Sequence, residues 1–369
     1  MSGFPRLRHL LALAVLASCR IDFERHVLPP GGGPVDSGAP DTAGPDAPPP
    51  VDSGTPPTDT GPTPTDTHIP PQDAPPAECP RPYALVPVQR LDLSPPQGYL
   101  ARFPLRAGTP RCADLPLDFA PYGALRHQDG YLVVSGSGRT RLVRVLDEGG
   151  RTLAEHPIDD TSAVPRKVLS LSVEFRRSVA VELMSGAYVR QYLVLREPMA
   201  AAAFWTNPSG SLVTHAASSP ELANQLYGVD GVNGRFFDLV PAGGNTFSRN
   251  VLYTLEGYAI EALTGALGVA TVQLAAYESS RQQSSLGVRN VRTAGGASPP
   301  FRLRPVPSCP GAPCLHVEAL AIDPSDSNES FVVCSAMDGR RRVIATGRVP
   351  CMVFDPPAMH RPNDVTLAP

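Results

Sequence analysis

The sequence predicts an all-β body, residues 79–369, behind a proline-rich N-terminal segment. Three observations lead to this fold class. Short runs of apolar and β-branched residues recur from Tyr83 onward, glycine and polar turn residues separate these runs, and helix candidates are few, Ser219–Leu226 being the clearest. The roughly 290 residues of the body are enough to bury a sizeable core, in one large domain or in two smaller ones.

The first element along the chain is an N-terminal signal, residues 1–18. Arg6 and Arg8 precede an apolar run from Leu10 to Ala17, which is too short to cross a bilayer of about 30 Å. The run ends in Leu16-Ala17-Ser18-Cys19, which resembles the cleavage motif of bacterial lipoproteins. That resemblance implies cleavage before Cys19, acylation of this cysteine and attachment to a lipid bilayer. The alternative is an ordinary secretory signal with an accidental cysteine.

Residues 19–78 follow as a predicted tether. Sixteen of the 48 residues from Pro29 to Pro76 are proline, and no Lys or Arg occurs between Arg25 and Arg81. Seven aspartates are spread through the same stretch. With so few apolar side chains, the segment cannot offset its own ordering entropy, so we expect a disordered, extended spacer that holds the body away from a membrane.

The body reads as strand after strand. Residues 130–134 and 141–146 form one candidate hairpin, and Asp147-Glu148-Gly149-Gly150 turns the chain into a further strand. Apolar and polar residues alternate in 168–175, and strand-like runs return at 178–183 and 188–195. Near the C-terminus, runs at 319–322, 331–334 and 342–346 are separated by polar turns, including Asp338-Gly339. This is the pattern of an antiparallel sheet protein.

The spacing of these runs resembles that of a β-propeller. Units begin near residues 124, 169, 211, 253 and 320, and the first three intervals match a blade of about 40 to 50 residues. The last interval needs an insertion, which residues 294–314 could supply, and an opening unit spans Tyr83 to Leu105. The resemblance implies about six blades. A large β-sandwich or a pair of β domains stays the alternative, because no blade signature repeats.

The cysteine count agrees with an oxidising compartment. Apart from Cys19 the chain has six cysteines, an even number that favours up to three disulfides. From proximity along the chain we expect the pairs Cys79–Cys112, Cys309–Cys314 and Cys334–Cys351. A zinc site is the rival reading, but only Cys309 and Cys314, with His316 close by, approach the spacing of zinc ligands.

No residue pattern identifies a reaction. The sequence has no Gly-x-Ser-x-Gly, His-Glu-x-x-His or phosphate-loop motif, so we expect no cofactor, no metal and no catalytic residues that the sequence could name. Asp323–Ser330 is the nearest approach to a calcium loop and fits a turn between strands better. Paired Asp159 and Asp160 point to opposite faces of an extended chain. The histidines of the body occur singly: His127, His156, His215, His316 and His360.

Charge also leaves the partner open. From residue 79 the chain has 28 basic residues against 25 acidic ones, and the Arg340-Arg341-Arg342 run reads as a solvated turn or strand face. An exported protein with this balance is not expected to bind nucleic acid. We expect a lipid-anchored envelope protein that binds or assembles with an envelope protein or glycan. Arg20 after the acylated cysteine favours the outer membrane, on its periplasmic side or at the cell surface. The alternative function is an extracytoplasmic hydrolase or lyase acting on polysaccharide or peptide.

Overall fold

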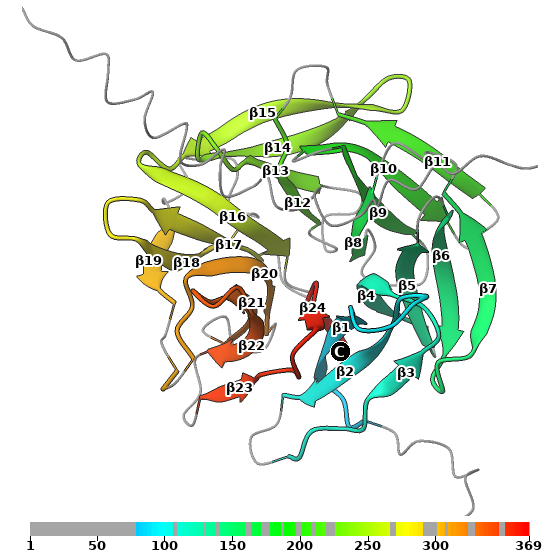
Figure 1. Ribbon diagram of the computed structural model, residues 1–369. Helices are drawn as coiled ribbons and strands as arrows, with labels where there is room; N and C mark the ends of the chain where they lie inside the picture. The colour runs from blue at the N-terminus through cyan, green and yellow to red at the C-terminus, as the bar shows by residue number, and fades with distance from the viewer. Residues whose placement is uncertain are drawn as a thin grey trace, which may run out of the picture. The chain divides into compact units, whose positions relative to one another are not determined.

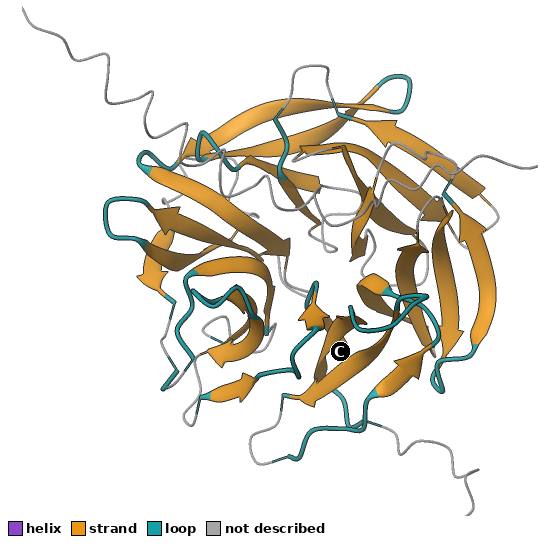
Figure 2. Ribbon diagram, in the orientation of Figure 1, coloured by secondary structure: helices purple, strands orange, loops and turns teal. Residues whose placement is uncertain are grey.

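The computed structural model describes residues 79–368, except for 106–108, 129, 138–139, 159–163, 171–177, 186–187, 197–200, 208–211, 219–225, 266–270, 291–300, 307–308, 311, 324–328 and 347–350. Within these residues the secondary structure consists of strands and turns, with no helix (Figure 2). Residues 1–78, which include the predicted signal, Cys19 and the tether, lie outside the described part. So do Asp159, Asp160 and all but the last residue of the expected helix.

The strands group into six units, the blades of a β-propeller, of which blade 1 has five strands and each of the others four (Figure 1). Blade 1 contains β1 (Tyr83–Arg90), β2 (Gln97–Pro104) and β3 (Leu115–Leu117), completed by β24 (His360–Pro362) and β25 (Thr366–Ala368). Blade 2 contains β4 (Pro121–His127), β5 (Gly130–Ser137), β6 (Thr140–Asp147) and β7 (Thr152–Pro157). Blade 3 contains β8 (Val164–Ser170), β9 (Ser178–Ser185), β10 (Tyr188–Arg196) and β11 (Ala201–Thr206).

The second half of the chain builds the other three blades in the same antiparallel order. Blade 4 contains β12 (His215–Ser218), β13 (Leu226–Asp230), β14 (Arg235–Ala242) and β15 (Thr246–Thr254). Blade 5 contains β16 (Tyr258–Gly265), β17 (Thr271–Glu278), β18 (Gln283–Asn290) and β19 (Arg302–Pro305). Blade 6 contains β20 (His316–Ile322), β21 (Ser330–Ser335), β22 (Arg341–Thr346) and β23 (Met352–Phe354). The outer strands of blades 3 and 4 also pair, in parallel, at Thr206 and Thr246.

The predicted blade starts are close to those observed, and the inner strands β4, β8, β12, β16 and β20 begin within five residues of the expected positions. The predicted insertion contributes the outer strand of blade 5, since β19 lies inside residues 294–314. Trp205 at the end of β11 is half-buried against Phe247, with ring centroids 5.0 Å apart. It therefore packs on the edge of an apolar cluster.

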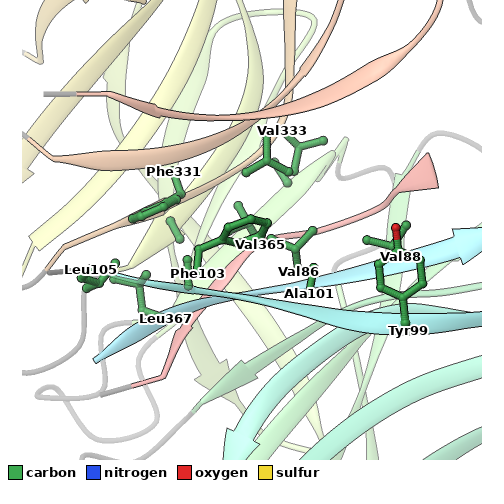
Figure 3. Packing of buried hydrophobic residues seen from close by; sticks show 14 residues of the cluster. Val86, Val88, Tyr99, Ala101, Phe103, Leu105, Phe331, Val333, Val365 and Leu367 are labelled. Carbon is green, nitrogen blue, oxygen red and sulfur yellow. The ribbon is translucent and has the colours of Figure 1, made fainter. Parts of the chain in front are cut away.

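The core consists of six apolar clusters, each lying between two neighbouring blades. Figure 3 shows the cluster between blades 1 and 6, in which Phe103 of β2 and Val86 of β1 approach Phe331 and Val333 of β21. Each blade packs between two neighbouring blades, so its strands are covered on both faces. For this reason nearly all residues of β1 and β4 are buried. Six clusters for six blades mean that the ring of blades is closed.

Closure depends on the C-terminal residues. The strand β24 pairs with β1 from Val88 to Arg90, and β25 pairs with β1 from Tyr83 to Leu85. Together they form the innermost strand of blade 1. In each of the other blades, this position is taken by the first strand of the blade itself. Blade 1 is therefore shared between the first and the last described residues of the chain.

The residues in two tight hairpin turns suit the backbone conformations that these turns require. The β14–β15 hairpin turns through Gly243-Gly244-Asn245, where Gly244 and Asn245 have φ angles of 72° and 55°. Glycine and asparagine tolerate this left-handed region best. The predicted Asp338-Gly339 turn joins β21 to β22, with φ of 74° at Gly339 and the Asp338 Oδ1 accepting a hydrogen bond from the Arg340 N–H at 3.0 Å.

Three disulfides join the six cysteines, and one of the expected pairs is present. Cys79 bonds Cys112, as predicted. The other two expected pairs are wrong, because the structure joins Cys309 to Cys351 and Cys314 to Cys334. The reason is strand pairing: β20 runs antiparallel to β21, which brings Cys314, two residues before β20, beside Cys334, with Cα atoms of the cysteines 5.2 Å apart.

Candidate functional site

The inner strands of all six blades run in the same direction, so their first residues gather at one end of the ring. Contacts between neighbouring inner strands follow the order β25, β4, β8, β12, β16, β20 and back to β25. We call the face where β4, β8, β12, β16, β20 and β24 begin the entry face. In blades 1, 4, 5 and 6 the described turn between the second and third strands lies on the same face, because the second strand ends beside the start of the inner strand.

Polar side chains reach this face through β-bulges. The pairing of an inner strand with its neighbour shifts register at Tyr122 in β4, at Arg166 and Lys167 in β8, at Glu261 in β16 and at Glu318 in β20. A bulge inserts an unpaired residue and re-aims its side chain. Four of the six blades thus place a polar or charged residue at comparable depth near the start of the inner strand.

The centre of the ring is nearly filled. A cavity of about 40 Å³, room for a few water molecules, is lined by residues of all six inner strands. One lining residue from each blade can be named: Leu125, Lys167, Ser218, Thr264, Ile322 and Leu367. The Lys167 Nζ donates a hydrogen bond to the Leu263 carbonyl oxygen at 3.1 Å, which joins blade 3 to blade 5.

Buried charges surround this lysine. Glu182 is fully buried, and its Oε2 accepts hydrogen bonds from Arg166 at 2.7 and 3.0 Å. Its Oε1 accepts the Ala216 N–H of blade 4 at 2.9 Å. Asp364, between β24 and β25, is also buried, and its Oδ2 has no hydrogen-bond partner within the described part of the chain. Burial raises the pKa of Asp364 to about 6, against the attraction of Lys167.

At the entry face, the carboxylate of Glu318 interacts electrostatically with two arginines, Arg341 and Arg361. The Arg341 Nη2 lies 3.0 Å from the Glu318 Oε2, and the Arg341 side chain is only 13% exposed. Arg341 also donates to the Pro362 carbonyl oxygen at 3.4 Å, next to Arg361. Burial, together with repulsion from Arg341, lowers the pKa of Arg361 to about 10. We call Tyr122, Glu318, Arg341 and Arg361 the channel mouth.

A carboxylate–histidine pair lies beside the mouth, between blades 5 and 6. The His316 Nδ1 and the Glu261 Oε1 are 2.5 Å apart, and the Glu261 Oε2 accepts hydrogen bonds from Ser284 Oγ at 2.6 Å and from the Val317 N–H at 3.0 Å. The hydrogen bond to Glu261 raises the pKa of His316. The His316 ring also contacts Tyr277, with centroids 4.6 Å apart.

Exposed apolar side chains are concentrated on the entry face. Of the nine large hydrophobic residues exposed in the described chain, five lie on turns or strand starts of this face: Leu91, Val164, Val232, Met337 and Met359. Met337 is 88% exposed and Met359 57% exposed. The Leu91 N–H donates to the Met359 carbonyl oxygen at 2.8 Å, and Arg340 of the Met337 turn donates to the Pro356 carbonyl oxygen at 2.6 Å. We call Leu91, Met337 and Met359 the apolar rim.

The structure separates the histidines that the sequence left scattered. His316 has two carboxylates close to its ring, those of Glu261 and Glu318, and the His360 Nε2 lies 4.0 Å from the Asp92 Oδ1. His127 is buried at the far end of β4, His156 lies on outer strand β7, and His215 bonds Thr214. His360 bonds the Tyr99 hydroxyl at 3.2 Å. Among the described residues, no three His, Cys, Asp or Glu side chains group as a metal site would require.

Sequence reasoning missed the channel mouth. The Arg340-Arg341-Arg342 run was expected to be solvated, but the side chains of Arg341 and Arg342 are 13% and 12% exposed. Bulges at Tyr122 and Glu318 leave no mark that the sequence pattern reveals, and Arg361 belongs to a strand that the spacing of blades does not predict.

Comparison with known proteins identifies the fold and no family. No protein-family model matches the chain, and no curated protein matches it. The structure is similar to that of TolB from Acinetobacter baumannii, with a TM-score of 0.53 and 12% identity over 78% of this chain and 67% of that one. It is also similar to a chain of the nidogen/laminin complex, with a TM-score of 0.50 and 14% identity over 78% of this chain and 98% of that one. No helix among the described residues is long and apolar enough to cross a membrane.

Proposed function

We propose that this chain is a lipid-anchored envelope protein whose propeller binds or assembles with another envelope component. In this proposal residues 1–18 are a signal, Cys19 carries the lipid, residues 19–78 are a tether, and residues 79–369 are the binding domain. The three disulfides support an oxidising compartment, since such bonds form and persist outside the cytoplasm. An outer-membrane position, on the periplasmic side or at the surface, is part of the same proposal.

The observation that carries the binding role is the apolar rim. Apolar side chains as exposed as Met337 and Met359 are unfavourable in water, and clusters of them on one face mark interaction sites. The remaining exposed hydrophobic residues, Leu153, Phe204, Val240 and Val251, lie on β7, β11, β14 and β15 rather than on the entry face. One structural neighbour comes from a complex of two proteins, which supports only the use of this fold in such assemblies.

Two measurements test the proposal. For anchoring, the full chain and its Cys19→Ser variant are compared by fractionation and by labelling with a radioactive fatty acid. Label in the membrane fraction that the variant lacks supports the anchor, whereas an unlabelled wild-type chain contradicts it.

For binding, residues 20–369, secreted through a separate signal, are immobilised and used to capture components of a solubilised envelope. We expect one retained protein or glycan, lost in the double variant Met337→Ser, Met359→Ser. The control variant Leu153→Ser, Val251→Ser removes similarly exposed apolar side chains from the outer strands and should retain the partner. Equal retention by both variants would place the interface elsewhere and remove the argument for the entry face.

A hydrolase or lyase is the second candidate, and the Glu261–His316 pair is the observation in its favour. A carboxylate that orients a histidine and raises its pKa is a common element of acid–base sites. Against this role, Glu261 is already bonded to Ser284 and Val317 and so fastens blade 5 to blade 6. The test is turnover of envelope polysaccharide and peptide substrates by the wild type and by Glu261→Gln. Turnover lost in a variant that stays folded would favour the enzyme.

A further inference from the structure

Two buried arginines contact the same tyrosine between blades 1 and 2. Arg102 of β2 and Arg126 of β4 are 3% and 4% exposed. The Arg102 Nη1 donates to the Tyr131 hydroxyl at 3.4 Å, and the Arg126 Cζ lies 5.1 Å from the centroid of the Tyr131 ring. The Tyr83 hydroxyl is 3.1 Å from that of Tyr131. We call these four residues the arginine cluster. It lies near the end of β4, on the face opposite to the entry face.

Three N–H donors of this cluster have no acceptor. Arg102 donates to two neutral oxygens, the Tyr131 hydroxyl and, at 2.9 Å, the Ala113 carbonyl oxygen. Arg126 donates to the carboxylate of Glu148 through its Nη2. The Nε atoms of both arginines and the Nη1 of Arg126 are buried without a hydrogen-bond partner in the described part of the chain. Buried donors of charged groups are unfavourable when they stay unpaired, so these three atoms call for an acceptor.

The charge of the cluster has the same sign as its donors. Glu148 pairs with Arg126 and also, nearer the surface, with Arg81 at 2.9 Å, so one carboxylate serves two guanidinium groups. The hydrogen bond between Tyr83 and Tyr131 uses the hydrogen of one hydroxyl and leaves that of the other. Burial raises the pKa of Tyr83, which keeps its hydroxyl protonated. A water molecule here would need acceptors for its own hydrogens, whereas an anion accepts only.

We propose that Arg102 and Arg126, with a hydroxyl of the tyrosine pair, bind a small monovalent anion of the halide class. The surroundings favour a small single charge, because Tyr83 and Tyr131 belong to an apolar cluster with Leu100 and a doubly charged phosphate would cost more to bury. The anion would join β2 of blade 1 to β4 of blade 2. The site does not depend on the proposed binding function, which uses the entry face.

The experiment measures the stability of the secreted residues 20–369 in urea as chloride is added to a chloride-free buffer. Gluconate, a larger anion, holds the ionic strength constant and so keeps the screening of surface charges constant. An anion that binds only the folded state should lower the unfolding equilibrium constant by about tenfold for each tenfold rise in chloride above its Kd. A stability that does not change with chloride would overturn the site.

Two variants locate the effect. Arg102→Met removes one guanidinium and should abolish the dependence on chloride. Arg144→Met is the matched control, since Arg144 of β6 lies 4.1 Å from the centroid of the Phe119 ring and its Nε and Nη1 already have acceptors, Glu155 and Ser135, each at 2.7 Å. This variant should keep the full dependence. The same loss in both variants, or in neither, would contradict the assignment to Arg102.

A direct measurement decides the case in which Arg102→Met does not fold. Crystals of residues 20–369 grown with bromide in place of chloride should give an anomalous peak within hydrogen-bond distance of Arg102 and Arg126. Peaks at other positions only would be adventitious ions, and the inference would then be wrong. Neither result changes the capture experiment on the entry face, so the site and the proposed function fail separately.

Discussion

The Thr366 Oγ1 donates a hydrogen bond to the Ala124 carbonyl oxygen at 2.8 Å, and so the last strand of the chain is fastened to the inner strand of the second blade. Asn363, just before, bonds the Pro121 carbonyl oxygen at 3.0 Å. The C-terminal segment that contains β24 and β25 therefore pairs with β1 within blade 1 and also hydrogen-bonds to blade 2.

Removal of residues 358–369 should open the ring. The deletion takes away β24 and β25, and it exposes the cluster in which Val365 and Leu367 pack against Phe103 and Phe331. We expect loss of a single cooperative unfolding transition, measured by urea denaturation with circular dichroism. The milder Thr366→Ala change should keep one transition and cost about 1 kcal/mol. A truncated chain as stable as the full one would contradict the closing role.

Lys167→Met should destabilise the fold by about 2 kcal/mol. The change keeps the length of the side chain but leaves the Leu263 carbonyl oxygen without its donor and Asp364 without the positive charge that most favours its ionised form. The measurement is the free energy of unfolding in urea at neutral pH. Arg249→Met, at an exposed residue of β15, serves as the control and should change stability little. A stabilised Lys167→Met variant would show that the buried charges are a net cost.

Asp364 should make the protein more stable in mild acid. Its pKa is displaced by burial from 3.8 to about 6, so the folded state binds the proton that the unfolded state has lost between these values. The buried, ionised carboxyl lowers the free energy of unfolding by about 3 kcal/mol above pH 6. This loss disappears as the pH falls toward 4. Lys167, Arg166 and Glu182 are the charges that act on the group.

The variant Asp364→Asn isolates this effect. At pH 7.5 we expect it to be more stable than the wild type in urea, and at pH 4.5 the difference should fall to about a third of that value. Comparison of the two proteins at each pH cancels the other titrating groups, including His316. A difference of the same size at both values would show that the carboxyl group does not titrate in this range.

The disulfide pairs can be checked by mass spectrometry of the unreduced chain after proteolysis. We expect peptides joined through Cys79–Cys112, Cys309–Cys351 and Cys314–Cys334. Replacing Cys314 and Cys334 together by serine should cost about 3 kcal/mol, from the loop of 20 residues that the bond closes. Recovery of a Cys309–Cys314 peptide from freshly folded protein would contradict the arrangement.

The strands and blade repeats were predictable because each depends on local patterns. Residues 141–146 and 331–334 are runs of apolar and β-branched residues ending at polar turns, and the structure has β6 and β21 there. The disulfides of blade 6 were not predictable from proximity, since an antiparallel partner brings Cys334 nearer to Cys314 than chain distance suggests. The channel mouth depends on bulges at Tyr122 and Glu318 and on β24, which comes from the C-terminal end of the chain. All three features arise only when the blades pack side by side.

The burial of Lys167 has a practical consequence. It is the only lysine of the chain and only 8% exposed, so the folded propeller offers amine-directed reagents almost no side chain to modify. Acylating dyes and lysine-directed cross-linkers should leave the intact ring unmarked, and a partner joined by such chemistry would escape detection. Conversely, label on Lys167 would report that the centre of the ring has opened, which gives the protein an intrinsic chemical probe of its own integrity.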